Sequence, residues 1–254
     1  MKTKILLCGA CGKMGGNVLS LALEDENTEV VCGVDLFPKE IGIPVYKSFS
    51  EVQEEADVII DFSSPAALAE RLEYAKAKGL GIVLASTGFT ESDLALIDEY
   101  SKEVAVFKTA NLSLGVNLMQ ALCKAAAQVL GESFDVEIIE RHHNLKKDAP
   151  SGTALMLADS VNEAFNGGKE YVYGRSGIVG AREKKEIGIH AVRGGTIVGE
   201  HEVCFAGEDE VITITHAASS KRVFAAGALR AAKFLKGKGA GRYEMKDLLA
   251  EENA

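Results

Sequence analysis

The chain has 254 residues and a formal net charge of −9 at pH 7, with 47% hydrophobic and 26% charged residues. This composition is ordinary for a globular protein, and the length suffices for one large domain or two smaller ones. Nucleic acids and anionic membranes require a basic surface, which an acidic chain does not offer, so we expect neither as a partner.

The sequence offers no candidate for a membrane span, a secretion signal or a metal site. Its apolar runs are short, as at Val58–Ile60, and residues 1–4 lead straight into a strand-like segment. The five cysteines are scattered and odd in number, which does not indicate a disulfide framework. We therefore expect a reduced, cytoplasmic protein without a bound metal.

The N-terminal half alternates strands with helices. Strands are expected at residues 5–8, 29–34, 58–61, 81–84 and 104–107, and helices at residues 14–23 and 66–77. This alternation predicts a Rossmann-like α/β domain with a parallel sheet. Because ligands of such sheets bind at the carboxyl ends of the strands, the residues that follow each strand are candidates for binding.

A glycine-rich loop joins the first strand to the first helix. It reads Gly9-Ala10-Cys11-Gly12-Lys13-Met14-Gly15, with the glycines spaced G-x-x-G-x-x-G. Such glycines permit a tight turn, let the backbone approach a pyrophosphate and bring the helix close to the strand. Asp35 stands about twenty residues further on, where a carboxylate can accept a hydrogen bond from the adenosine ribose. The pattern predicts a dinucleotide site.

Three other interpretations of this loop are weaker. A Walker A loop requires Ser or Thr where Met14 stands and glycine where Leu7 stands. Cys8 and Cys11 form a Cys-x-x-Cys, but no second cysteine pair completes a zinc site, and Cys8 belongs to a strand. The last alternative, glycines that only shape a turn, stays open.

The choice of coenzyme is open as well. An acid at Asp35 repels the 2′-phosphate of NADPH, whereas Lys13 and Lys39 would attract it. The sequence is thus compatible with both NADH and NADPH. Three short segments that follow strands are further candidates for coenzyme contact, although Ser, Thr and Asn also favour helix caps. These candidates are Phe62, Ser86, Thr87, Gly88, Thr109, Ala110 and Asn111.

The pattern changes after Gly115. Helices are expected at residues 115–130, 151–165 and 223–235, strands at 135–140, 187–193, 196–205 and 211–216, and a tail at 243–249. Period-2 runs with short turns predict an antiparallel or mixed sheet with one polar face. We expect a second, α+β domain there, after which the last helix and the tail return to the first domain.

The segment from Glu140 to Thr153, ERHHNLKKDAPSGT, concentrates groups that neither a buried strand nor a solvated helix favours. Its histidines and lysines supply protons and positive charge, and the start of the next helix favours a carboxylate. A small anionic substrate that is held and protonated fits this composition. Outside the core of this motif, we interpret His190, His201 and His216 as structural or surface residues, Lys147 as a solvated charge, and Arg193 as either a substrate-steering or an oligomer contact.

Several motifs resemble the dihydrodipicolinate reductase family. They are GACGKMG near the start, DFSSP at Asp61, STGF at Ser86, ERHHNLKKDAPSGTA at Glu140, VRGGTIVGEHEV at Val192 and ITHAASS at Ile214, and they span nearly the whole chain. The resemblance implies a cytoplasmic homotetramer that reduces a small cyclic dicarboxylate with NADH or NADPH. Together with the predicted elements, it places a dinucleotide-binding domain at residues 1–112 and 220–254 and a substrate-binding and tetramerisation domain at residues 113–219.

The resemblance also assigns residues. The family's catalytic histidine and lysine fall on His142 and Lys146, and its dicarboxylate-binding residues fall on His143, Ser151, Gly152 and Thr153. Two departures concern the coenzyme. Lys13 stands where the family usually has Arg, which weakens a bidentate grip on phosphate, and Ala85-Ser86-Thr87-Gly88 replaces the usual Gly-Thr-Thr-Gly.

These residues allow a reduction in which either Lys146 or His142 donates the proton while the other polarises the substrate. Because the coenzyme and substrate loops belong to different domains, we expect domain closure. Two other functions stay open: a non-catalytic NAD-sensing module, and another two-domain dehydrogenase, such as one acting on aspartate or homoserine.

Overall fold

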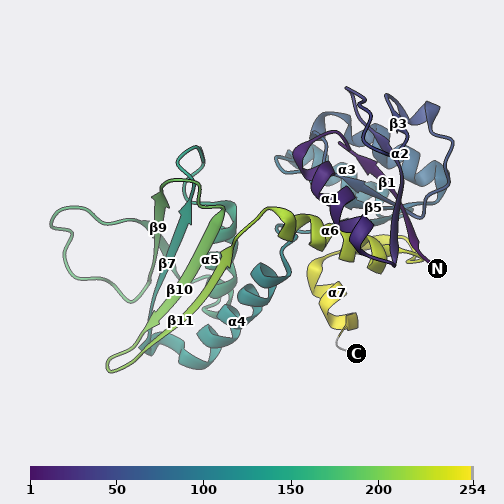
Figure 1. The fold of residues 1–254 in the computed structure, drawn as a ribbon. Helices are drawn as coiled ribbons and strands as arrows, with labels where there is room; N and C mark the ends of the chain where they lie inside the picture. The colour runs from purple at the N-terminus through teal and green to yellow at the C-terminus, as the bar shows by residue number, and fades with distance from the viewer. Residues whose placement is uncertain (253–254) are drawn as a thin grey trace. The chain divides into compact units, whose positions relative to one another are not determined.

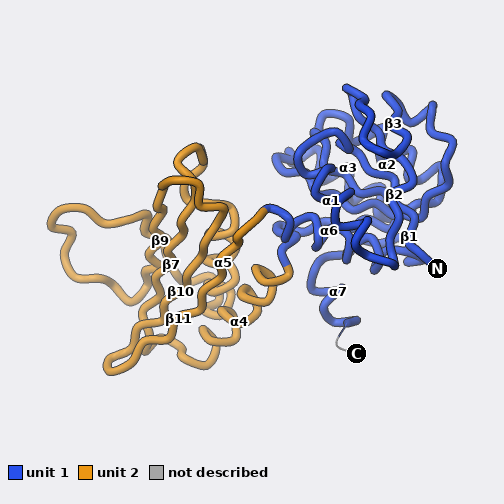
Figure 2. Tube along the Cα trace, viewed as in Figure 1, with its two compact units in different colours: residues 1–113, 221–254 blue, residues 114–220 orange. Residues whose placement is uncertain are grey.

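The computed structural model describes residues 1–252 in two compact units (Figure 2). Unit 1 comprises residues 1–113 with the C-terminal residues from Lys221 onward, and unit 2 comprises residues 114–220. Residues 253 and 254, which fall in the predicted first domain, lie outside the described residues. Within the described part of the chain, no helix combines the length and the hydropathy needed to cross a membrane.

Unit 1 is built on a seven-stranded sheet in the spatial order β12-β6-β5-β4-β1-β2-β3, and all paired neighbours are parallel. The strands are β1 (Thr3–Cys8), β2 (Thr28–Val34), β3 (Val45–Tyr46), β4 (Val58–Asp61), β5 (Gly81–Leu84), β6 (Ala105–Lys108) and β12 (Gly241–Tyr243). β4 and β5 are buried along their whole length. Continuous burial is expected of a parallel sheet that is covered on both faces.

Helices cover both faces of this sheet. They are α1 (Lys13–Glu24), α2 (Leu68–Lys78), α3 (Glu91–Tyr100), α6 (Arg222–Leu235) and α7 (Met245–Glu252). Ile5 and Leu7 of β1 belong to an apolar cluster with α1, α6 and α7, whereas Leu6 belongs to a cluster with α2 and α3. The alternation of side chains along β1 therefore feeds one core on each face.

Unit 2 is a five-stranded sheet with α4 (Leu114–Leu130) and α5 (Gly152–Ala164) on one face (Figure 1). Its spatial order is β11-β10-β7-β9-β8. β7, β8 and β9 are mutually parallel, and β10 is antiparallel to both of its neighbours, β7 and β11. The strands are β7 (Asp135–His142), β8 (Glu170–Tyr173), β9 (Glu186–Arg193), β10 (Gly199–Ala206) and β11 (Val211–Ala218). Met119, Ile138 and Leu157 contribute to the core between sheet and helices.

The predicted fold class is confirmed, because a parallel Rossmann-like sheet accompanies a mixed sheet in an α/β chain. The sequence analysis did not predict α3, β3, β8 or β12. Helix α3 begins at a capping box, in which Thr90 Oγ1 accepts from Asp93 N and the Asp93 carboxylate accepts from Thr90 N. β3 and β12 have only two and three residues, too few for periodicity to show.

Candidate active site

The covered face of the unit 2 sheet changes from apolar to polar toward the carboxyl end of β7. Every second residue of β7 is buried, in the order Val136, Ile138, Glu140 and His142. On the neighbouring strand β10, buried His201 is the register partner of Glu140. The alternation that builds the core therefore also buries a carboxylate and two imidazoles close together.

Glu140 is fully buried and accepts four hydrogen bonds. Its Oε2 accepts from His142 Nδ1 and Arg193 Nη1, both at 2.7 Å. Its Oε1 accepts from Arg193 Nη2 at 2.7 Å and from Ser151 N at 2.9 Å. Burial alone would raise the pKa of Glu140, but the hydrogen bonds from Arg193, His142 and Ser151 outweigh it and lower that pKa. Glu140 is therefore ionised, and because a carboxylate only accepts, His142 carries a proton on Nδ1.

The loop between His142 and Ser151 contains Lys146. Its Nζ donates to both carboxylate oxygens of Asp148 at 2.9 Å, which lowers the pKa of Asp148. Arg193 Nη2 donates to the backbone oxygen of Asp148 at 2.7 Å, so the same guanidinium holds both Glu140 and the loop. His143 is half-buried, and Lys147, which follows Lys146, is exposed.

Helix α5 begins where this loop ends. Ser151 is its N-cap, and the Ser151 hydroxyl accepts from Ala154 N at 3.1 Å and lies 2.9 Å from His201 Nε2. Because Ser151 N donates to Glu140, the N–H and the hydroxyl of this residue already have partners within the protein. Gly152 is exposed and Thr153 half-buried, at the helix end that carries a partial positive charge.

Two histidines pack against each other at this point. The rings of His142 and His201 lie edge to face, with centroids 5.2 Å apart. Burial, helped by the nearby His142, lowers the pKa of His201 to about 4, so its ring is neutral at pH 7. A Cβ on Gly199 would come within 3.0 Å of His142 Nε2, and the glycine therefore leaves room for that imidazole.

In unit 1, geometry requires two of the loop glycines. Gly9 has a φ of +73°, and a Cβ there would come within 2.9 Å of the Phe62 backbone oxygen. A Cβ on Gly15 would come within 2.4 Å of the Gly9 and Ala10 oxygens. Gly12 is the N-cap of α1 and supplies no side-chain cap, which leaves that end of the helix to an external anion. Of the other loop residues, Ala10 is buried, Cys11 and Met14 are half-buried and Lys13 is exposed.

Asp35 joins the end of β2 to the glycine loop. Its Oδ2 accepts from Cys11 N and its Oδ1 from Phe37 N, each at 3.0 Å. A cavity of about 400 Å³ lies beside it, and four predicted coenzyme residues contribute to its lining: Gly9, Gly12, Asp35 and Phe62. Lys47 and Arg71, which the sequence analysis did not single out, line the cavity as well, whereas Lys13 and Lys39 do not.

The remaining predicted coenzyme residues follow β5 and β6. Ser86 Oγ is buried and has no hydrogen-bond partner among residues 1–252. Thr109 Oγ1 donates to Asn111 O at 3.2 Å, and Asn111 Oδ1 accepts from Ser113 N at 2.8 Å. Thr87, Gly88 and Ala110 are exposed. Three features of unit 1 therefore fit a dinucleotide. Within the described residues, they are the unpaired hydroxyl of Ser86, the lack of room for a Cβ at Gly9 and Gly15, and the N-terminus of α1 without a side-chain cap.

Comparison with known sequences decides the family. Residues 3–112 match the family model described as "Dihydrodipicolinate reductase, N-terminus", and residues 115–249 match "Dihydrodipicolinate reductase, C-terminus". The chain belongs to the dihydrodipicolinate reductase family. The resemblance inferred from the motifs is thus confirmed, as is the class of enzyme, a reductase that uses NADH or NADPH.

Individual members of the dihydrodipicolinate reductase family match over nearly their full length. The 4-hydroxy-tetrahydrodipicolinate reductase of Caldanaerobacter subterraneus subsp. tengcongensis is 52% identical over 249 residues, which cover 98% of this chain and 99% of the relative. That of Clostridium novyi is 46% identical over 252 residues, 99% of this chain and 100% of the relative. The structure of dipicolinate-bound dihydrodipicolinate reductase from Paenisporosarcina sp. TG-14 superposes with a TM-score of 0.79 at 26% identity, covering 96% of this chain and 98% of the other.

Three residues of the polar cluster were not recognised, or were left undecided, in the sequence analysis. Glu140 was not singled out, although its spacing from His142 on an alternating strand places both on one face. For Arg193, the sequence left open whether it steers the substrate or contacts another subunit. His201 was interpreted as structural, and no local signal could have linked it to Ser151, because the contact depends on how β10 pairs with β7.

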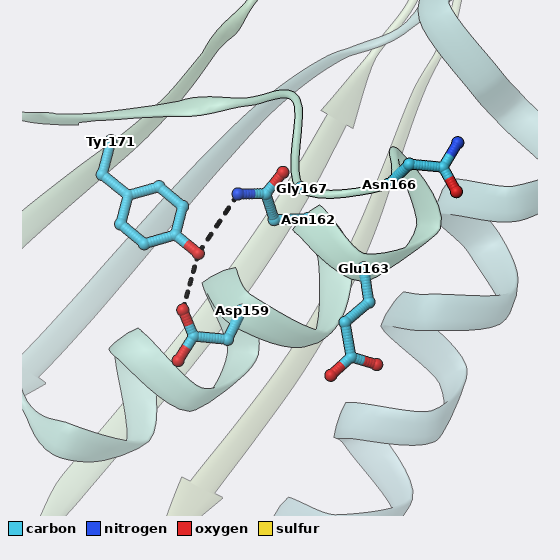
Figure 3. Close-up of a pocket in the computed structure, with 6 residues that line it drawn as sticks. All are labelled: Asp159, Asn162, Glu163, Asn166, Gly167 and Tyr171. Atoms are coloured by element: carbon cyan, nitrogen blue, oxygen red, sulfur yellow. Dashed lines mark hydrogen bonds between the residues drawn. The ribbon is translucent and has the colours of Figure 1, made fainter.

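Another cavity, of about 420 Å³, lies in unit 2, and none of these three residues lines it (Figure 3). Its lining residues are Asp159, Asn162, Glu163, Asn166, Gly167 and Tyr171. Tyr171 Oη donates to Asp159 at 2.6 Å, and no predicted site residue lines the cavity. Among the residues that the structure describes, no group of three or more His, Cys, Asp or Glu side chains could hold a metal.

Proposed function

We propose that this chain converts 4-hydroxy-tetrahydrodipicolinate to tetrahydrodipicolinate with the residues gathered around Glu140, as a step of diaminopimelate and lysine biosynthesis in the cytoplasm. The 4-hydroxyl leaves as water to give dihydrodipicolinate, and hydride and a proton then reduce that ring. The reaction is inferred from membership in the reductase family. The observation that supports the site is the Glu140 carboxylate, which joins His142 to the N-terminus of α5. Lys146 lies on the loop between these two ends. The cysteines of the described chain are all unpaired, which suits a reducing compartment.

The substrate carries two carboxylates, and unit 2 offers groups for them. We assign one carboxylate to the first turn of α5, at Gly152 and Thr153, where helix N–H groups and the helix dipole favour an anion. His143, half-buried on the preceding loop, is positioned to pair with the same ligand. Ser151 supports this arrangement chiefly as the cap that fixes the turn, because its hydroxyl and its N–H are already engaged.

When bound, the coenzyme supplies a hydride to the conjugated ring carbon of the substrate, and the product then needs one proton. We assign that proton to the ammonium of Lys146, which the Asp148 carboxylate holds in the structure. His142, fixed through Nδ1, presents the opposite edge of its ring and polarises the substrate. General acid assistance of this kind is worth on the order of 10²–10⁴ in rate.

Unit 1 would hold the coenzyme. Its pyrophosphate fits against the loop Gly9–Gly15 and the N-terminus of α1, and its adenosine ribose fits beside Asp35. Ser86 and Thr109, at the ends of β5 and β6, are assigned to the nicotinamide side. Lys47 lines the same cavity as Asp35, so a 2′-phosphate would meet both a cation and an acid there, and both coenzymes remain substrates.

The test is the oxidation of NADH and of NADPH, followed at 340 nm, after addition of the freshly made product of the preceding synthase. We expect substrate-dependent loss of absorbance with at least one coenzyme. Coenzyme binding without any turnover would instead indicate a non-catalytic binding module. Turnover with aspartate semialdehyde in place of the dicarboxylate would indicate a different two-domain dehydrogenase.

We also propose a homotetramer assembled through unit 2. The sheet face opposite α4 and α5, the edge strand β11 and the loop between β8 and β9 expose apolar side chains, among them Ile178, Val179, Val192 and Val211. Exposed apolar side chains that gather on one domain are typical of a subunit interface. Light scattering should give about four times the 27.0 kDa of one chain, and a monomer mass at micromolar concentration would contradict the proposal.

A further inference from the structure

The carboxylate of Glu140 closes the substrate loop at both ends. The loop leaves β7 after His142 and enters α5 at Ser151, and these two residues donate to different oxygens of the same carboxylate, at 2.7 and 2.9 Å. His143 and Lys146 lie on the segment between them. One fully buried side chain thus fixes where the loop begins and where it ends.

Arg193 extends this arrangement from β9. Its two terminal nitrogens bind the two oxygens of Glu140 at 2.7 Å, and one of them also donates to the backbone oxygen of Asp148 within the loop. Asp148 in turn holds Lys146 at 2.9 Å. The buried carboxylate is therefore linked to the Lys146 ammonium through Arg193 and Asp148. The Asp148 backbone oxygen accepts from Arg193, and its side-chain carboxylate accepts from Lys146.

A purely structural role would require only that the charge of Glu140 be neutralised, and Arg193 alone achieves that. The structure shows more, since both oxygens also accept from site residues and no described donor to the carboxylate comes from outside the site. Because Arg193 pairs with Glu140, the carboxylate stays ionised and can accept the hydrogen bond that fixes the ring of His142. The same pairing leaves no unpaired charge beside the site.

We propose that Glu140 is the positioning residue of the reductase site. It holds the proton of His142 on Nδ1, which directs Nε2 away from Glu140, and it sets the position of the loop that carries His143 and Lys146. This inference rests on the proposed function, because it concerns residues assigned to the substrate and to proton transfer. The two can nevertheless fail separately, since the tautomer of His142 is measurable without any turnover.

The first test is nuclear magnetic resonance of the free chain labelled with ¹⁵N-histidine, which contains five histidines. Assignment uses a His142→Gln variant. We expect neutral His142 as the Nδ1–H tautomer in the unmodified chain. In Glu140→Gln, the amide can donate to Nδ1 and the Nε2–H tautomer should appear. An Nε2–H tautomer in the unmodified chain would overturn the proposal even if Glu140→Gln failed to fold.

The second test is kinetic, with Glu137→Gln as the matched control. Glu137 lies on the same strand but on the opposite face, and it too is held by arginines, Arg175 and Arg182. We expect Glu140→Gln to lower kcat on the order of 10²-fold through misplacement of the loop, with the Kd for NADH unchanged. The control should keep kcat within roughly twofold.

A variant of Arg193 separates the two effects of Glu140, on the His142 tautomer and on the loop. Arg193→Gln keeps the Glu140–His142 hydrogen bond, so it should preserve the Nδ1–H tautomer while raising the KM for the dicarboxylate through a looser loop. A loss of kcat in Glu140→Gln no larger than in Glu137→Gln would contradict the positioning role. Absence of turnover in the unmodified chain would instead refute the proposed function and leave the tautomer measurement to decide the role of Glu140.

Discussion

Each unit of the molecule contains a buried carboxylate paired with an arginine at the carboxyl end of a strand. In unit 2, Glu140 follows the core of β7 and pairs with Arg193 through both oxygens. In unit 1, Asp61 ends β4 and pairs with Arg71, whose Nε lies 2.9 Å from Asp61 Oδ2. Both carboxylates are completely buried, and each is followed by a loop that belongs to a candidate binding site.

The two pairs differ in how completely the carboxylate is satisfied. Asp61 Oδ1 accepts from the backbone and hydroxyl of Ser63, but within residues 1–252 Oδ2 has only the ion pair with Arg71. Burial therefore raises the pKa of Asp61 despite Arg71 and Ser63, whereas the four hydrogen bonds of Glu140 lower its pKa. Burial alone therefore does not set the pKa of a carboxylate. The number of well-placed donors decides whether its pKa rises or falls.

The largest expected effect concerns the loop that Glu140 holds. Lys146→Ala should lower kcat on the order of 10²–10⁴-fold, because it removes the proposed proton donor. NADH should bind as before, since the coenzyme loop belongs to unit 1. Stopped-flow kinetics and NADH fluorescence titration measure the two effects. Lys147→Ala is the control, and similar losses in both variants would remove Lys146 from the chemistry.

The second prediction compares the two arginines directly. Arg71→Met should lower the free energy of unfolding by about 3–5 kcal/mol, because it leaves a buried carboxylate without its cation. Arg193→Met should cost less, about 1–3 kcal/mol, because His142 and Ser151 still donate to Glu140. Urea unfolding at pH 7 measures both. Equal losses would show that the extra donors of Glu140 contribute nothing.

The third prediction concerns the coenzyme loop. Gly15→Ala should weaken NADH binding by about tenfold or more, because the new Cβ would come within 2.4 Å of two backbone oxygens and force the loop apart. Gly16→Ala is the matched control, since a Cβ there meets nothing within 4 Å. Calorimetric titration with NADH should separate the variants, and equal affinities would show that the loop does not contact the coenzyme.

The smallest expected effect is a pH dependence at the edge of the Glu140 cluster. The pKa of His201 is lowered from 6.5 to about 4, so the unfolded chain binds a proton before the folded chain does. The contribution of His201 to stability is therefore complete above pH 6.5 and is lost as the pH falls through about 4. His201→Gln should flatten the unfolding free energy over this window by up to about 1.4 kcal/mol per pH unit. Denaturant unfolding at a series of pH values measures how the unfolding free energy changes with pH. The same pH dependence in His201→Gln and the unmodified chain would contradict the lowered pKa of His201.

The sequence was sufficient for the fold class and for the two loops, because glycine spacing and the His-Lys-Ser-Gly-Thr segment are local signals. The sequence did not reveal which residues from other strands contact those loops. Arg193 and His201 reach the site only through the pairing of β9 and β10 with β7, and Lys47 reaches the coenzyme cavity from beyond β3. Contacts that depend on strand register leave no pattern along the chain. The local signal that was available and not used is the two-residue spacing of Glu140 and His142.

The most direct test of the Glu140 cluster as the substrate site is hydrogen–deuterium exchange of the NADH-saturated chain with and without dipicolinate, a planar dicarboxylate. If the Glu140 cluster forms the substrate site, added protection should concentrate in residues 142–154, with Gly152 and Thr153 among the most protected amides. Protection confined to the cavity at Asp159–Tyr171, or to unit 1, would contradict the central claim.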